Sequence, residues 1–169
     1  MTYVIREMKQ EDIHAVQNVA KIAWHDTYEG IIPREIQDSF LDEAYSDEKM
    51  KYRLKNTHLF VAEEEGEVIG FANFSPVRLQ NEAELGAIYL LPDQQGKGIG
   101  SALLQSGIKA LKGIRKLYIH VEAANEKGKR FYEAKGFAEL EQFEEDFEGH
   151  LMQTVRMVLY IGKSRNENI

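Results

Sequence analysis

The chain has 169 residues and a formal net charge of −7, with 43% hydrophobic and 29% charged residues, values typical of one soluble globular domain. The acidic balance argues against binding along a nucleic-acid backbone, and no apolar run approaches the roughly 18 residues that a membrane span needs. There is no cysteine, which excludes disulfides, thiolate metal sites and a cysteine nucleophile. With no apolar signal segment at residues 1–13, we expect a cytoplasmic protein.

The first half of the chain predicts a strand, three helices and a hairpin. Apolar residues recur at helical spacing after residue 12, and Glu65-Gly66 separates two runs rich in strand-forming residues. The expected elements are a strand at 3–6, a helix from 13 to about 24 whose apolar stripe ends at Trp24, a short helix from Pro33, a helix at 47–55, and strands at 59–62 and 67–74.

The second half predicts alternating strands and helices, followed by a closing hairpin. The expected elements are a strand at 84–91 that Pro92-Asp93 ends, a helix at 99–112, a strand at 117–121, a helix at 127–135 that Gly136 ends, and strands at 137–147 and 154–161. This order predicts a mixed α/β sheet. We expect one domain over residues 1–162 and a polar tail at 163–169.

Three glycines, Gly96, Gly98 and Gly100, stand where the helix at 99–112 should begin. Glycine gives a ligand access to the free N–H groups of a helix N-terminus, where phosphate binds well. A P-loop is excluded because its glycine and lysine positions do not match. A dinucleotide fingerprint matches imperfectly, although Glu122 follows about 20 residues later, where that fold places a ribose-binding carboxylate. A turn that binds nothing is the third interpretation.

The glycine turn belongs to a larger pattern. Residues 95–100, QGKGIG, resemble the Q/R-x-x-G-x-G/A signature of the GNAT (GCN5-related) N-acetyltransferase superfamily. The preceding IYLLPD resembles the strand and Pro-Asp step of that family. Asn125 and the later FYEAKGF, seven residues apart at Asn125 and Tyr132, resemble its N…FYxxxGF element. The resemblance spans residues 3–161 and includes a subset related to polyamine acetyltransferases.

The resemblance implies a mostly antiparallel sheet, flanked by helices, in which the strands at 84–91 and 117–121 form a splayed parallel pair. It also implies that acetyl-CoA binds without a metal. The backbone of Ile88, Tyr89 and Leu90 would pair with the pantetheine, and the N–H of Leu90 would polarise the thioester carbonyl. The pyrophosphate would lie on the turn formed by Gly96, Lys97, Gly98, Ile99, Gly100 and Ser101. Among the nearby cations Lys97, Lys129, Arg130 and Lys135, we expect Lys135 to reach a phosphate.

For catalysis, the resemblance assigns the general acid to Tyr132, whose proton would go to the departing thiolate. Asn125 would bond the pantetheine or a water, or cap the helix that follows it. Many relatives have a second carboxylate where this chain has Gly86, so the general base is left to Glu84, with Glu122 in reserve or with no dedicated base. Gly128 replaces a common alanine, which suggests that the cofactor passes close to it.

The acceptor is expected to bind between the first helices and the last hairpin. Residues 23–33 resemble a stretch found in polyamine acetyltransferases, and Trp24, Tyr28 and His25 could line a pocket there, although Trp24 also fits a core position. Residues 141–148 contain five acidic side chains, which would attract a polyamine or a lysine-like amine or form a solvated hairpin. No histidine spacing indicates a metal.

The prediction is an acetyl-CoA-dependent N-acetyltransferase that acts on a small cationic amine by direct transfer in a ternary complex. The alternatives are a protein α-amine or lysine acetyltransferase and a catalytically inactive acetyl-CoA sensor, with an NAD-binding module as a distant third. A homodimer is compatible with each.

Overall fold

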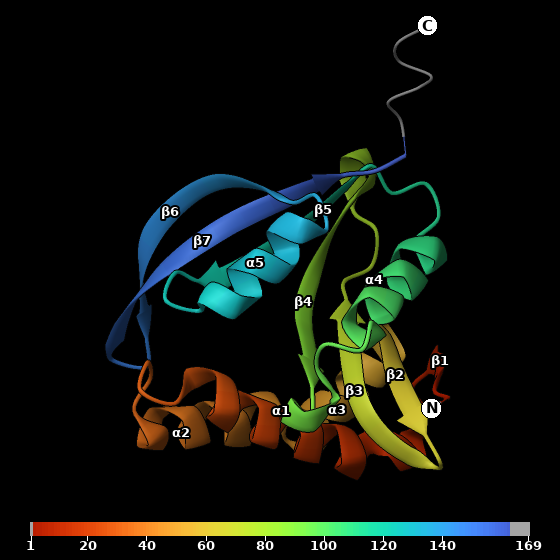
Figure 1. Cartoon of the computed structure of the whole chain (residues 1–169), viewed down its shortest axis with the longest axis horizontal. Helices are drawn as coiled ribbons and strands as arrows, with labels where there is room; N and C mark the ends of the chain where they lie inside the picture. Colours follow the sequence, from red (N-terminus) through yellow and green to blue (C-terminus); the bar gives the residue numbers. More distant parts are fainter. Residues whose placement is uncertain (1, 163–169) are drawn as a thin grey trace, which may run out of the picture.

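The computed structural model describes residues 2–162 and is built around a seven-stranded sheet in the order β1-β2-β3-β4-β5-β7-β6 (Figure 1). The strands are β1 (Val4–Glu7), β2 (His58–Glu64), β3 (Glu67–Phe74), β4 (Glu82–Leu90), β5 (Lys116–Glu122), β6 (Ala138–Phe147) and β7 (His150–Tyr160). Every neighbouring pair is antiparallel except β4 and β5, which are parallel. The predicted mixed sheet with one parallel pair is confirmed.

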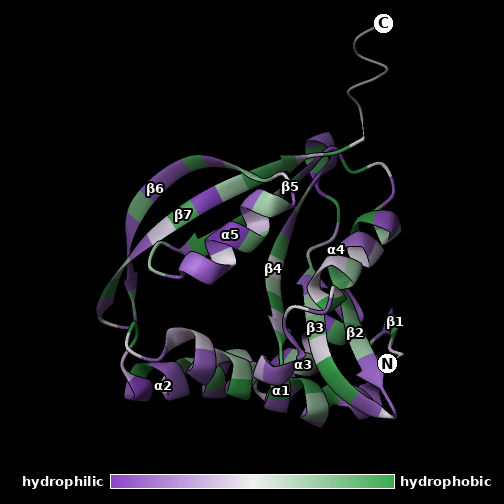
Figure 2. Cartoon of the chain, in the orientation of Figure 1, coloured by the Kyte–Doolittle hydropathy of each residue, from purple (hydrophilic) through white to green (hydrophobic). Residues whose placement is uncertain are grey.

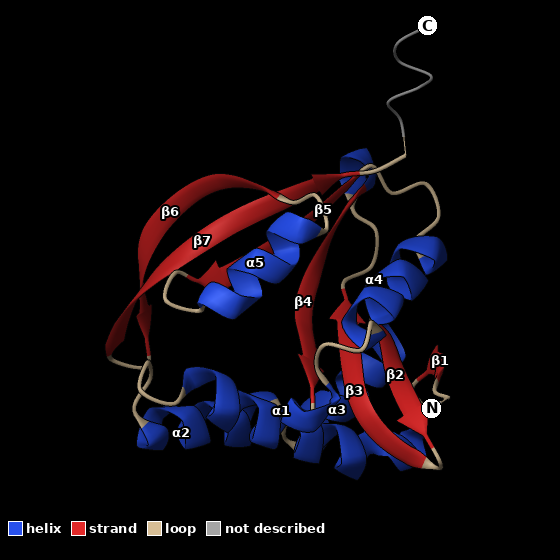
Figure 3. Cartoon of the chain, viewed as in Figure 1, coloured by secondary structure: helices blue, strands red, loops and turns tan. Residues whose placement is uncertain are grey.

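Five helices flank this sheet. They are α1 (Ile13–Tyr28), α2 (Arg34–Ala44), α3 (Asp47–Asn56), α4 (Ile99–Ala110) and α5 (Glu126–Ala134), and short 3-10 turns precede α1, β4 and α4. Figure 3 shows α1, α2 and α3 gathered at one end of the molecule, with α4 and α5 standing apart from them. None of the helices within residues 2–162 is both long and apolar enough to cross a membrane.

The two faces of the sheet bury two separate hydrophobic clusters. One cluster joins α4 to alternate residues of β4 and β5, including Leu85 and Ile119. The other joins α1, α2 and α3 to the opposite face, where Tyr89 of β4 lies. Because side chains alternate along a strand, His120 of β5 projects toward the second face. Figure 2 shows the contrast between the largely hydrophobic β3 and the largely hydrophilic α5, which has no buried residue.

The parallel pairing of β4 with β5 is short and then stops. It joins residues 82–84 to 116–118, ending at Glu84 opposite Tyr118. On its other edge β4 stays paired with β3 through Leu90, with a register shift that leaves Gly86 as an extra residue between Leu85 and Ala87. A bulge of this kind bends its strand. Beyond it, β4 keeps one edge paired and turns the other toward the gap between β4 and β5.

The β6–β7 hairpin is longer than the sequence predicted. β7 begins at His150, not at residue 154, because the hairpin turns tightly at Glu148 and Gly149, whose φ values are 49° and 87°. The hairpin arches across the molecule and brings its turn back toward α2 (Figure 1). Phe147, at the end of β6, packs within the second hydrophobic cluster. The predicted polar tail at 163–169 lies outside the described residues.

Candidate active site

A cleft of about 430 Å³ opens where β4 and β5 separate. It brings together segments far apart in the sequence: the end of α1, the bulged half of β4, the glycine turn, His120 and Val121 of β5, and one side of α5. Most of the predicted cofactor residues line it, namely Ile88, Tyr89, Leu90, Gly96, Gly98, Gly100, Ser101, Asn125 and Lys135. Tyr28 and Tyr132 line it too, whereas Glu84, Trp24, Lys97 and Ile99 do not.

The glycine turn has the backbone that a phosphate cradle needs. Gly96 and Gly98 have φ values of 80° and 85°, and a Cβ on either would meet nothing within 4 Å. Gly98 is the N-cap of α4, and no side chain caps this helix end. Gly100 has a different requirement, because a Cβ there would lie 3.3 Å from the ring of Phe131. The open side of this turn therefore presents helix N–H groups to the cleft, a favourable arrangement for an anion.

The free edge of β4 provides an extended backbone beside this turn. The N–H of Leu91 donates to the carbonyl of Ile69 at 2.9 Å, on the β3 side. Successive amides of a strand point to opposite edges, so the N–H of Leu90 points into the gap. The edge at Ile88, Tyr89 and Leu90 is thus suited to pairing with an extended ligand, and that it pairs with pantetheine stays a prediction.

Three tyrosines surround the inner part of the cleft. Burial raises the pKa of Tyr132, whose ring lies edge-on to Phe131 and Phe137 with centroids 5.4 Å away in each case. Burial also raises the pKa of Tyr89 and of Tyr28, and hydrogen bonds of Tyr28 with Tyr89 and Asn125 oppose the rise at Tyr28. All three hydroxyls therefore keep their protons at neutral pH and are available as donors.

Asn125 acts as a helix cap, and this explains Gly128. The Oδ1 atom of Asn125 accepts the N–H of Gly128 at 2.9 Å, which is the N-cap geometry of α5. A Cβ on Gly128 would lie 2.6 Å from Nδ2 of Asn125. The sequence suggested that a bound cofactor requires glycine here, but the capping side chain already requires it.

The two candidate bases are placed very differently. Both carboxylate oxygens of Glu122 accept backbone N–H groups, from Ala124 at 2.6 Å and from Gln153 at 3.2 Å. Glu122 is buried and holds the end of β5 against β7. Glu84 lies just outside the cleft, where one oxygen is 3.6 Å from Arg78 and the other 3.8 Å from Nδ1 of His120. Of the two carboxylates, Glu84 is therefore the more available for proton transfer.

The predicted acceptor residues divide between cleft and core. Trp24 is buried, with its ring centroid 4.5 Å from that of Tyr28 and 4.6 Å from that of Phe40. It supports Tyr28 from behind and lines neither cavity described here. The ring of His25 turns toward α2, where Nε2 lies 2.8 Å from Oδ1 of Asp38. Tyr28 is therefore the predicted acceptor residue that reaches the cleft.

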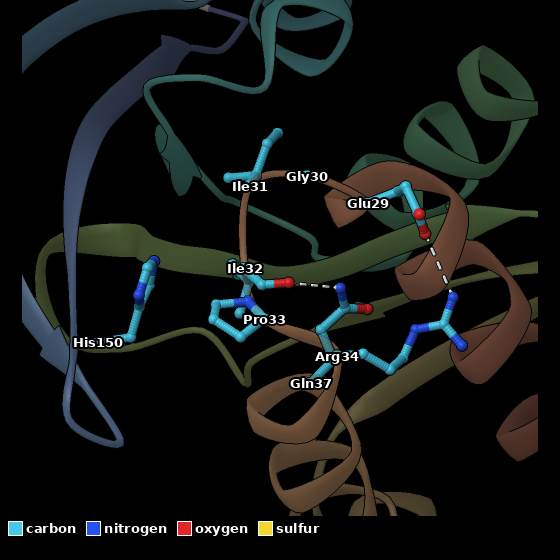
Figure 4. Close-up of a pocket in the computed structure, with 8 residues that line it drawn as sticks. All are labelled: Glu29, Gly30, Ile31, Ile32, Pro33, Arg34, Gln37 and His150. Carbon is cyan, nitrogen blue, oxygen red and sulfur yellow. Dashed lines mark hydrogen bonds and ion pairs between the residues drawn. The ribbon is translucent and has the colours of Figure 1, made fainter.

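A second cavity, of about 400 Å³, lies beside the connection between α1 and α2 and is shown in Figure 4. Its wall includes Glu29, Arg34, the buried Gln37, and His150 from the start of β7. The Nε2 atom of Gln37 donates to the carbonyls of Tyr28 and Ile32, at 3.2 and 2.8 Å. Because Nε2 meets two carbonyls, the amide cannot flip, and among residues 2–162 its Oε1 has no hydrogen-bond partner.

The cations near the glycine turn have mixed positions. Lys135 lines the cleft, and its Nζ atom lies 5.8 Å from the ring centroid of Phe131. Lys127, which the sequence did not single out, also lines it and donates to Gln95 at 2.6 Å. Lys97 is exposed and bonded to Gln94 at 3.2 Å. Lys127 was missed because its contact with residue 95 depends on how α5 packs, which no local pattern shows.

Comparison with known proteins agrees with this geometry. The model of the acetyltransferase (GNAT) family matches residues 17–137. The chain belongs to the GNAT acetyltransferase family. This GNAT chain is 38% identical over 127 residues to YuaI of Bacillus subtilis, described as an uncharacterized N-acetyltransferase, with 72% of each chain covered. It is 33% identical over 145 residues to a spermidine N(1)-acetyltransferase of Thermoplasma acidophilum, covering 81% of this chain and 89% of the relative.

Among solved structures, the GNAT chain is similar to the PaiA N-acetyltransferase of Thermoplasma acidophilum in complex with coenzyme A. The TM-score is 0.81 at 30% identity, covering 95% of this chain and all of the other. The predicted family, fold and enzyme class, an N-acetyltransferase, are therefore confirmed. No group of three or more metal-ligating side chains occurs within residues 2–162.

Proposed function

We propose that the protein transfers the acetyl group of acetyl-CoA directly to a primary amine in a ternary complex. The observation that carries this proposal is the continuity of the cleft, which runs from the glycine turn along the free edge of β4 to the half-buried Tyr132. An anion site, an extended backbone edge and a protonated phenol are what a thioester with a phosphate-bearing tail requires.

The residues present fit acetyl-CoA, since the space beside Gly96 and Gly98 is open and neither residue carries a Cβ that would keep phosphates from the backbone N–H groups. When bound, acetyl-CoA supplies an activated acyl group. The amides of Gly96 to Ser101 would hold its pyrophosphate, with Lys135 near the phosphates. The edge of Ile88, Tyr89 and Leu90 would align the thioester, and the N–H of Leu90 would polarise its carbonyl. Asn125 caps α5 beside this path and is in reach of the pantetheine.

Acetyl transfer needs a neutral amine, a stabilised oxyanion and a proton for the departing sulfur. Tyr132 is the donor of that proton, because its hydroxyl is buried beside the path and remains protonated. Glu84, at the edge of the cleft, is the carboxylate that would assist removal of the amine proton, directly or through a group that lies between them. Tyr28 lies opposite, at the end of α1, and would contact the amine as it enters.

We further propose a small cationic amine, such as a polyamine, as the acceptor. The Thermoplasma relative named as a spermidine acetyltransferase supports this class. Residues 26–44 carry six carboxylates and one arginine, and residues 139–148 carry six carboxylates and no lysine or arginine. The first segment lines the second cavity through Glu29, Arg34 and Gln37, and His150, two residues after the second segment, lines it from β7. This cavity would take the distal part of a long amine. The combined charge of the two segments would attract and orient a polycation.

A CoA-release assay across a panel of polyamines, amino acids and peptides tests both parts of the proposal. We expect release with polyamines above background and above that with neutral amino acids. CoA release with peptides and with no other amine would mean that the acceptor is an amine of a protein and not a small molecule. Thermal stabilisation by acetyl-CoA without CoA release in the presence of any amine would favour the acetyl-CoA sensor. That alternative is based on Gly86, which stands where many relatives have a carboxylate. The absence of stabilisation by acetyl-CoA would overturn the proposal itself.

A further inference from the structure

His120 occupies a position that no motif identifies. Parallel pairing of β4 and β5 ends with Glu84 opposite Tyr118. Two residues further along each strand, Gly86 and His120 follow on the two sides of the widening gap, and both line the cleft. A Cβ on Gly86 would meet only the carbonyl oxygen of Asn73, at 3.7 Å. β4 therefore offers no side chain at this level of the cleft, and β5 offers an imidazole.

Two side chains lie against the ring of His120. Its Nδ1 atom lies 3.8 Å from the Oε2 atom of Glu84. Its ring meets Phe143 of β6 edge-on, with centroids 5.8 Å apart. A carboxylate beside Nδ1 favours the tautomer with its proton on that atom, which leaves a lone pair on Nε2, on the side of the ring away from Glu84.

His120 also faces the half of the molecule from which an amine would arrive. Alternation along β5 directs its side chain to the same face as α1 and α2, opposite to Ile119 and the α4 cluster. Tyr28, at the end of α1, lines the same cleft. The imidazole thus lies on the face of the sheet that α1 and α2 cover, in the same cleft as the edge of β4 along which the thioester would lie.

The charged groups around His120 come from three strands or their ends. Glu84 of β4 is the carboxylate beside the imidazole, and Arg78 lies 3.6 Å from that carboxylate. Arg156 of β7 is the direct cross-strand partner of His120, and its guanidinium lies 4.1 Å from the ring centroid of Tyr118. The surroundings of His120 are therefore mixed in charge and not purely acidic.

We infer that His120 is the proton acceptor of the transfer, with Glu84 as the residue that positions it; this inference rests on the proposed function. The amine nitrogen attacks the thioester carbonyl carbon, and a C–N bond forms while the C–S bond breaks. Nε2 of His120 takes the proton that the amine loses, and the hydroxyl of Tyr132 gives a proton to the thiolate. Solvent then returns His120 and Tyr132 to their resting forms, so an amine that enters as ammonium releases one proton overall.

The test is the pH profile of kcat/KM for CoA release in the wild type, His120→Gln and Glu84→Gln, with His58→Gln as control. Removing a general base lowers kcat by about 100-fold or more, so we expect at least that loss in His120→Gln, together with loss of the rising limb of the pH profile. Glu84→Gln should keep the limb but lose about 10-fold in kcat, the scale of an orienting residue. His58 is exposed on β2 away from the cleft, and its variant should behave as wild type.

A second variant, His120→Ala, should recover activity when imidazole is added, which loss of structure would not allow. Acetyl-CoA stabilisation of each variant verifies that the donor site is folded. Turnover within threefold of wild type in His120→Gln, or an unchanged pH limb, would overturn the inference while leaving the proposed function intact. Failure of the wild type to release CoA with any amine would instead overturn the proposed function, and with it the ground for a base.

Discussion

The donor side and the acceptor side of the cleft are built from different materials. The donor side consists of backbone: the turn at Gly96 and Gly98, and the free edge of β4 that ends at Leu90. The acceptor side consists of side chains that meet from α1 and β5, such as Tyr28 and His120. The donor side is formed by segments that are continuous in the sequence. The acceptor side forms only when the folded sheet brings distant residues together.

This difference explains why the two sides respond differently to substitution. A backbone site depends on dihedral angles and on the absence of Cβ atoms, so most exposed side chains around it can change without effect. A side-chain site depends on individual functional groups, each held by its neighbours. Substitutions in the two halves should therefore separate donor binding from turnover and from acceptor binding.

The largest effect is expected at Tyr132, where both halves meet. Tyr132→Phe should lower kcat by about 100-fold, the contribution of a general acid, and leave the affinity for acetyl-CoA nearly unchanged. Because burial raises the pKa of this hydroxyl above its usual value near 10, it stays protonated throughout the neutral range. Tyr132 should then cause no falling limb in the pH profile below about pH 10. Steady-state CoA release from pH 6 to 10 measures both.

Tyr160→Phe is the matched control, since Tyr160 is 55% exposed at the end of β7 and should be silent. If Tyr132→Phe weakens acetyl-CoA binding but turns over at the wild-type rate once saturated, Tyr132 is part of the donor site and not the acid.

A backbone test of the donor side compares two glycines with the same conformation. Gly98 and Gly113 have φ values of 85° and 81°, and a Cβ on either meets nothing within 4 Å. Valine at either position strains the backbone by a similar amount, on the order of 1–2 kcal/mol. Gly98→Val should also place a side chain over the helix N–H groups and weaken acetyl-CoA binding by about 10-fold or more, the loss of one to two good hydrogen bonds.

In Gly113→Val the melting temperature should fall by the same amount as in Gly98→Val, while the affinity for acetyl-CoA stays unchanged. Calorimetry and thermal shift with acetyl-CoA would measure both quantities. Equal weakening of acetyl-CoA binding in both variants would mean that Gly98 acts only through stability.

Most of the predicted donor-side residues line one cleft, and the reason is physical. A positive φ at Gly96 and Gly98 restricts which residues can occupy these positions, and so does the pairing of β4. The motifs at 88–101 and 125–137 therefore identify the fold and the cleft together. His120 belongs to no such motif, because its place opposite Gly86 follows from the register of β4 against β5. The length of β7 was missed because Glu148-Gly149 makes a tighter turn than the acidic run suggested. Trp24 fitted helical spacing equally well as core and as pocket, and packing against Phe40 decides its place.

A smaller effect is expected from the charge of the acceptor side. In Glu144→Gln/Glu148→Gln the hairpin loses two exposed carboxylates, and the KM for a polyamine should rise about threefold at low salt, the scale of exposed charge pairs. The rise should disappear at high ionic strength because exposed charges are screened. Steady-state kinetics at two salt concentrations measures this.

The control removes the same charge elsewhere: Glu64→Gln/Glu67→Gln changes the turn between β2 and β3 and should leave KM unchanged. If both double variants raise KM equally, net charge and not the hairpin attracts the acceptor.

The smallest effect concerns the junction of Asn125 with Gly128. Loss of an N-cap lowers stability by about 1 kcal/mol, so Asn125→Ala should destabilise by that amount. Gly128→Ala should also lose the cap by displacing the capping amide, whose Nδ2 would lie 2.6 Å from the new Cβ. Alanine is favoured over glycine inside a helix by about 1 kcal/mol, which offsets that loss. Asn125→Ala/Gly128→Ala loses the same cap and keeps the same gain, so it should be about as stable as Gly128→Ala and more stable than Asn125→Ala, as denaturant unfolding would measure. Additive losses would mean that glycine at 128 serves something other than the cap, and a passing donor molecule would again be the explanation to test.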